Sequence, residues 1–145
     1  MLCDVTKIHT GYGVMPRVTH TTDDEDWGKE GSSKKIHVAR SISQKGGFAS
    51  MDRIIKRVEN EYWIIQVDEF QSWMLGFYKF TGKWKTSKIG ERKILVEYSY
   101  NLHSKNPIFY LFNWIFVKIF WRQYMKRVLE NIRNLAYGLE PYRYD

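Results

Sequence analysis

Residues 78–100, YKFTGKWKTSKIGERKILVEYSY, show the clearest alternation of apolar and polar residues in the chain. One face of the first part is formed by Tyr78, Phe80, Gly82 and Trp84, opposite three lysines and a threonine. One face of the second part is formed by Ile94, Val96, Tyr98 and Tyr100. A two-residue period is typical of a strand with one buried face. With a turn at residues 88–91, the stretch predicts an antiparallel hairpin with one aromatic-rich side.

Earlier segments show the same period. Ile36 and Val38 alternate with Lys35 and His37, which predicts a half-buried strand. The pair Gly46-Gly47 predicts a hairpin turn. Residues 61–70 are rich in β-branched and aromatic side chains, the composition that strands prefer. The predicted strands before the hairpin are residues 17–22, 33–40, 48–59 and 61–70.

One long helix is predicted over residues 108–137. Pro107 suits a helix start, Gly138 suits a helix end, and no Gly or Pro lies between them. The second half carries an apolar stripe at three- and four-residue steps, formed by Trp121, Met125, Val128, Ile132 and Leu135. The first half, residues 108–121, is apolar on almost every side.

These elements predict one α+β domain over residues 1–145, in which a curved antiparallel sheet is wrapped around the C-terminal helix. The helix is needed to cover the aromatic faces of the strands. A strongly curved sheet and a single helix interlock less closely than two flat layers, so apolar space is expected between them as a ligand cavity.

Composition narrows the function classes. The net charge is +7, but the basic residues are spread along the chain in runs of at most two, so a nucleic-acid partner is not expected. Cys3 is the only cysteine, which excludes an intramolecular disulfide and a zinc site built of thiolates. Together with an amino end that lacks the pattern of a secretory signal, this predicts a cytoplasmic protein.

An ordered series of residues resembles the START-like (SRPBCC, helix-grip) superfamily, within it the polyketide cyclase/dehydrase and lipid transport family. The series begins with Gly11-Tyr12-Gly13 and Pro16, continues through Trp27 and the strand around Trp63, and includes Gly82-Lys83-Trp84 and the terminal helix. It spans about residues 10–137. The resemblance implies a cavity for a lipid or another hydrophobic small molecule, and in some relatives cyclisation or dehydration there. Because few residues precede Gly11, the family's N-terminal strand and helices are expected to be short or missing.

The predicted cavity lining is mostly aromatic. It consists of Trp63, Ile65, Tyr78, Phe80, Trp84, Tyr98, Tyr100, Phe112, Phe116 and Phe120. Plain packing in the core is the alternative for each of these residues. Buried phenols need hydrogen-bond partners, which a ligand or ordered water in a cavity supplies, and this favours a pocket.

No catalytic or metal-binding constellation is evident. The histidines, at positions 9, 20, 37 and 103, lack metal-ligand spacing and are expected at the surface or at an edge. The acidic run 23–26 lacks the spacing of a calcium loop. No cofactor is therefore predicted. Gln66, Asp68 and Glu97 fall opposite the predicted lining by strand parity. Binding of a hydrophobic ligand is therefore favoured over catalysis, with an enzyme of the polyketide cyclase/dehydrase type as the alternative.

Residues 107–121 give a further alternative. The segment is too short and too interrupted for a membrane-spanning helix, which needs about 20 apolar residues. Its all-round apolarity exceeds what one sheet can cover, so it could contact a membrane surface transiently or form a homodimer. Vesicle binding that falls with salt distinguishes the first from salt-tolerant self-association.

Overall fold

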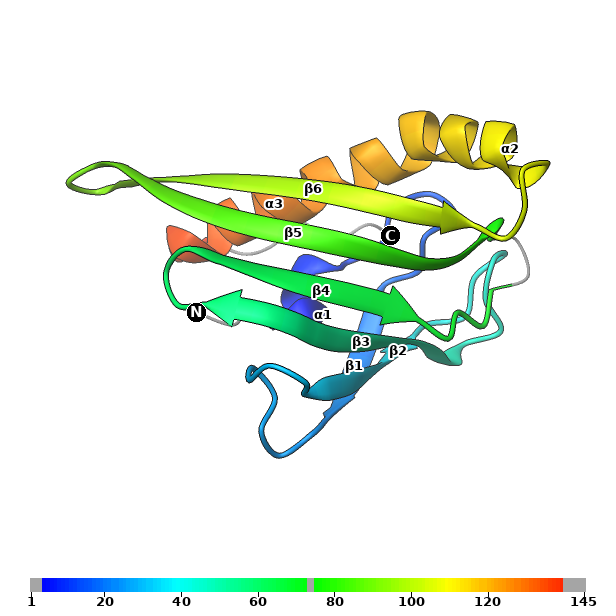
Figure 1. Ribbon diagram of the computed structural model, residues 1–145, viewed down its shortest axis with the longest axis horizontal. Coiled ribbons are helices and arrows are strands. Elements are labelled where there is room, and N and C mark those ends of the chain that lie inside the picture. The colour runs from blue at the N-terminus through cyan, green and yellow to red at the C-terminus, as the bar shows by residue number, and fades with distance from the viewer. Residues whose placement is uncertain (1–3, 73–74, 140–145) are drawn as a thin grey trace.

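The computed structural model describes residues 4–72 and 75–139. Within them, six strands form one antiparallel sheet in which each strand pairs with its neighbours in sequence (Figure 1). The elements before the long helix are α1 (Val5–Ile8), β1 (Val18–Asp23), β2 (Ser33–Val38), β3 (Gly47–Val58), β4 (Tyr62–Asp68), β5 (Phe77–Gly90) and β6 (Lys93–Ser104). The predicted strands are all present, within a few residues of their expected ends.

The helical segment after β6 has three parts: α2 (Phe109–Phe116), a π-helical turn η1 (Val117–Trp121) and α3 (Arg122–Ala136). In Figure 1, α3 crosses behind the sheet, whereas α2 lies near the end of β6. The fold is α+β, with a curved antiparallel sheet packed against one long C-terminal helix, as the sequence predicted. The interruption by a π turn was not predicted.

The central hairpin is longer than the alternation suggested. The strands β5 and β6 remain paired as far as Gly90 and Lys93, so the turn is tighter than the predicted one at residues 88–91. A bulge between Phe77 and Lys79 interrupts the register at the other end. The bulge buries Phe77 and leaves Tyr78 51% exposed, which corrects the predicted inward facing of Tyr78.

The main core lies between the middle of the sheet and the long helix. Its buried members are Ile8, Ile65, Val67, Phe77, Phe80, Trp121, Tyr124, Met125 and Val128. A smaller cluster under β1 to β3 contains Val18, Ile36, Val38 and Ala49. The predicted helix stripe is confirmed, because Trp121, Met125 and Val128 are buried and Ile132 and Leu135 pack against the same cluster.

The segment before β1 is attached to α3. The side-chain amide of the fully buried Asn131 donates hydrogen bonds to the carbonyl of Ile8, at 3.0 Å, and to Oγ1 of Thr10, at 3.1 Å. Among the described residues, α1 is the only element that precedes the sheet.

Helix α2 is anchored through one polar side chain. The Nδ2 atom of Asn113 donates to the carbonyl of Gly76, at 3.0 Å, and to Oγ of Ser104, at 2.7 Å. Most of the surrounding apolar side chains are exposed, namely Ile108, Phe109, Tyr110, Leu111, Phe112, Trp114 and Ile115. Among the described residues, no helix has the length and apolarity needed to cross a membrane.

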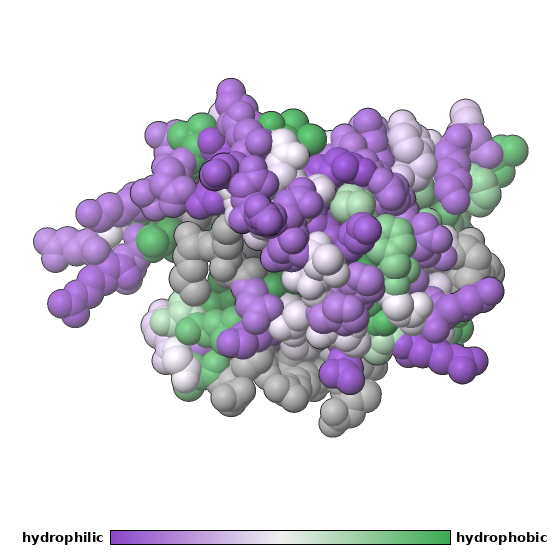
Figure 2. Space-filling model, turned by 90° about the horizontal axis from the view of Figure 1, so that it is seen from below, coloured by the Kyte–Doolittle hydropathy of each residue, from purple (hydrophilic) through white to green (hydrophobic). Residues whose placement is uncertain are grey.

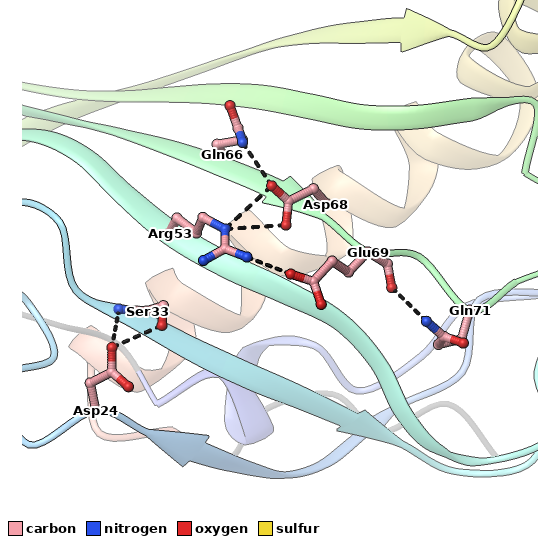
Figure 3. Close-up of polar contacts among 7 residues, drawn as sticks. All are labelled: Asp24, Ser33, Arg53, Gln66, Asp68, Glu69 and Gln71. Atoms are coloured by element: carbon pink, nitrogen blue, oxygen red, sulfur yellow. Dashed lines mark hydrogen bonds and ion pairs between the residues drawn. The ribbon is translucent and has the colours of Figure 1, made fainter.

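The outer face of the sheet is polar. Nε of Arg53 lies 3.3 Å from a carboxylate oxygen of Asp68, which also accepts a hydrogen bond from the Gln66 amide (Figure 3). Glu97 forms an ion pair with Lys85 at 3.4 Å. Gln66, Asp68 and Glu97 thus face away from the helix, as strand parity predicted. In the view of Figure 2, hydrophilic side chains cover most of the surface, with smaller hydrophobic patches between them.

Candidate ligand-binding cavity

A cavity of about 1140 Å³ lies between the inner face of the sheet and α3. Its walls come from β1 to β6, from α1 and from the second half of the long helix. The lining reaches exposed residues at the β3–β4 turn, at the β5–β6 turn and at the last turn of α3. The cavity therefore opens at the end of the molecule where these three turns lie (Figure 1).

The aromatic wall contains much of the predicted lining. The predicted residues that line the cavity are Trp63, Ile65, Phe80, Trp84, Tyr98 and Tyr100. The rings of Trp84 and Tyr98 lie 5.0 Å apart in an edge-to-face arrangement, and Trp63 meets Trp84 at 6.4 Å. Such aromatic pairs hold one another in fixed positions on neighbouring strands.

Gly82 makes room for the two phenols. A Cβ atom at this position would lie 3.1 Å from the hydroxyl of Tyr98, from a ring carbon of Tyr100 and from a methyl group of Ile65. A side chain here would therefore push the phenols out of place. The glycine in Gly82-Lys83-Trp84 thus has a physical role at the cavity wall.

Other predicted lining residues lie elsewhere. Tyr78 is turned outward by the bulge, and Phe112, on α2, is 48% exposed. Phe116 packs in the core against Phe77 and Trp121, and the ring of Phe120 lies beside Gly13. Phe112 and Phe116 miss the cavity because α2 packs near the end of β6 and not over the middle of the sheet.

Two charged residues outside the predicted lining also face the cavity. Lys34 of β2 is 5% exposed and Asp52 of β3 is 9% exposed, and both line the cavity. They are directly paired in the sheet register and share the inner face. The ammonium of Lys34 lies 4.1 Å from the centre of the Trp27 ring, a cation–π contact.

Burial changes the ionisation of this pair. It raises the pKa of the Asp52 carboxyl to about 7, an effect that Asp68 and Asp23 strengthen and Lys34 opposes. Burial also lowers the pKa of Lys34, although Asp52 acts in the opposite direction. The carboxyl of Asp52 therefore changes between its protonated and ionised forms near neutral pH, on the same wall of the apolar cavity as Lys34.

A second polar contact joins the N-terminal segment to α3. Nδ1 of His9 lies 2.6 Å from the hydroxyl of Tyr124, and both residues line the cavity. Burial lowers the pKa of His9 to about 4, with a further contribution from the positive charge of Lys34, so the imidazole is neutral at pH 7. The prediction that the histidines lie at the surface is wrong for His9.

The phenols of the cavity stay protonated. Burial raises the pKa of Tyr98, Tyr100 and Tyr124. The hydroxyl of Tyr100 lies 3.3 Å from the sulfur of Met125.

Comparison of the chain with protein-family models and with curated proteins finds no match. Any function must therefore be argued from the cavity itself, which combines a large apolar wall with a small set of buried polar groups.

Strand parity contained a signal for the two missed residues. The alternation that places Ile36 and Val38 inward also places Lys34 inward, two residues earlier. Asp52 likewise has the parity of Ser50 and Ile54, both of which are buried. Asp52 is therefore an inward carboxyl, unlike Asp68 and Glu97.

Proposed function

We propose that the protein is a START-like cytoplasmic protein that binds a hydrophobic small molecule or lipid in the cavity between the sheet and α3. The cavity of about 1140 Å³ is the observation that carries this proposal. Small-molecule sites typically have volumes of about 300–1,000 Å³ and combine apolar walls with a few polar groups. The cavity lies just above this volume range and combines an apolar wall with a few polar groups. It opens at one end, which gives a ligand a route of entry.

Native mass spectrometry before and after organic extraction tests the proposal. A bound apolar compound that is released by the solvent is the expected result, and its mass identifies its chemical class. Titration of the extracted protein with the neutral dye Nile red gives a second readout. A protein that carries no compound and does not bind the dye would contradict the proposal.

The Trp84→Ala variant should bind Nile red roughly tenfold or more weakly than the wild type, because burial of a large apolar side chain contributes about 1.5–3 kcal/mol. Trp84 lines the cavity. The matched control is Lys83→Ala, since Lys83 is exposed and lies over the outer ring of Tyr62 at 4.8 Å. Equal losses in the two variants, measured by fluorescence titration, would show that the dye does not occupy the cavity.

An enzyme of the polyketide cyclase/dehydrase type is the second candidate, and Asp52 favours it. A carboxyl with a pKa of about 7 is suited to take up and release a proton at neutral pH. If Asp52 transfers protons, the wild type and Asp52→Asn should hold different compounds, substrate accumulating in the variant. The same compound in both proteins, identified by mass spectrometry, would favour a carrier.

A further inference from the structure

Lys34 and Asp52 are buried in the cavity without the partners that buried charges normally have. Among residues 4–72 and 75–139, no hydrogen bond and no ion pair within 4.0 Å involves the ammonium of Lys34 or the carboxyl of Asp52. The Trp27 ring covers one side of the ammonium. Burial of a cation without a hydrogen-bonded anion is costly, so an anionic group at this place would be stabilised by the pair.

The chemistry of the pair selects the group that would complete it. The ammonium of Lys34 offers three hydrogen-bond donors and no acceptor, and Asp52 offers one O–H donor when it is protonated. With Asp52 protonated, the pair carries one net positive charge. A ligand carboxylate can accept hydrogen bonds from both groups and neutralise that charge. An alcohol or a ketone could accept a hydrogen bond, but the ammonium would then have only the more distant carboxylates of Asp23 and Asp4 as counter-charges.

We propose that the cavity binds an apolar carboxylic acid, with its carboxylate at Lys34 and Asp52 and its apolar body along the aromatic wall. The inference rests on the proposed function and specifies its ligand class. The body would extend past Ile65 and Trp84 toward the open end at the β5–β6 turn. The carboxylate end of such a ligand would contact charged and polar groups, and its apolar end would contact the aromatic wall.

Binding of an acid at this place should depend on pH. The groups that interact electrostatically with Asp52 come from several elements and are Lys34 on β2, Asp68 on β4, Asp23 on β1, Tyr98 and Tyr100 on β6 and Tyr124 on α3. The phenols remain neutral, and so does His9 above its pKa of about 4. Asp52 is therefore the group whose charge changes near pH 7, and its ionisation would repel the ligand carboxylate.

Isothermal titration calorimetry with decanoic acid and with 1-decanol tests the inference. For the wild type, affinity for the acid should fall roughly tenfold from about pH 6 to about pH 8, because the protonated fraction of Asp52 falls by that factor across a pKa of about 7. Affinity for the alcohol should stay constant. In Asp52→Asn, the acid should bind equally well at both pH values.

The Lys34→Met variant should lose roughly tenfold or more of its affinity for decanoic acid, because it loses the charged hydrogen-bond donor for the ligand carboxylate. Its affinity for 1-decanol should fall by a clearly smaller factor, because the alcohol has no charge to pair with the ammonium. Lys35→Met is the matched control, since Lys35 is the exposed neighbour on the outer face of β2. Circular dichroism melting curves establish that each variant is folded, and Asp52→Asn gives an independent readout if Lys34→Met is not.

The outcomes separate the two proposals. Equal affinity for acid and alcohol, unchanged by Lys34→Met and by pH, would overturn the inference and leave a cavity for neutral apolar ligands. An absence of binding to the acid, the alcohol and Nile red would overturn the proposed function together with the inference.

Discussion

The Asp52→Asn variant should be more stable than the wild type at pH 8 by about 4 kcal/mol and nearly as stable as the wild type at pH 4, since each unit of pKa shift is worth about 1.4 kcal/mol. The pKa of the carboxyl is about 7 in the folded protein, against 3.8 for an aspartate in water. Between these values the folded state holds a proton that the unfolded state has released. Stability therefore falls as pH rises from 4 to 7, and it stays reduced above that window.

Asparagine removes this loss because it resembles the protonated carboxyl and cannot ionise. The difference in unfolding free energy between the variant and the wild type should grow from about pH 4 to about pH 7 and then stay constant. Urea denaturation at a series of pH values measures it. Asp26→Asn is the control, because Asp26 lies in an exposed loop. A constant difference across the whole range would show that Asp52 is not protonated in the folded state near neutrality.

His9 has the opposite effect on the pH dependence of stability, over a pH range that overlaps that of Asp52. Its pKa is lowered from 6.5 to about 4, so the unfolded state takes up a proton first as the pH falls. The stability associated with the neutral imidazole is present above pH 6.5 and is lost as the pH falls toward 4. The unfolding free energy of the wild type thus contains two opposing dependences on pH, and comparison with the Asp52→Asn variant separates them.

The Trp121→Ala variant should lose about 3–5 kcal/mol of unfolding free energy, the usual cost of removing a buried aromatic side chain. Trp121 is 7% exposed, and its ring lies 5.2 Å from those of both Phe80 and Tyr100. It therefore connects the long helix to two central strands. Urea denaturation followed by circular dichroism measures the loss.

Trp121→Phe serves as the comparison. The indole nitrogen of Trp121 is buried and has no hydrogen-bond partner among the described residues, so phenylalanine removes an unsatisfied donor and keeps most of the packing. Its unfolding free energy should be much closer to that of the wild type. If the alanine variant were as stable as the phenylalanine variant, the helix would not be held to the sheet by this ring.

The fold was largely predictable because its strands have one solvent-exposed face and one buried face. Alternation located the β5–β6 hairpin, and the absence of Gly and Pro located the long helix. Tyr78 was placed on the wrong face because a bulge changes parity without a mark in the sequence. Phe112 was misplaced because an apolar residue is usually buried, whereas α2 leaves it exposed.

The polar part of the cavity was missed for a related reason. Lysine and aspartate are seldom buried, so both residue types are predicted at the surface even where strand parity places them on the inner face. Parity alone would have placed Lys34 and Asp52 on the inner face. Their neighbourhood depends on the pairing of β2 with β3, which periodicity within one strand does not reveal.

The π-helical turn at Val117–Trp121 divides the long helix into two parts, α2 and α3, whose packing against the rest of the protein is set by different residues. Each residue of an α-helix rotates the next by about 100°, so an extra residue in one turn offsets the faces on either side of it. Asn113 before the turn meets Gly76 and Ser104, while Trp121 at its end meets the central strands. Evolution could therefore alter the surface of α2 without altering the cavity, whereas deletion of one residue within the turn would change both at once.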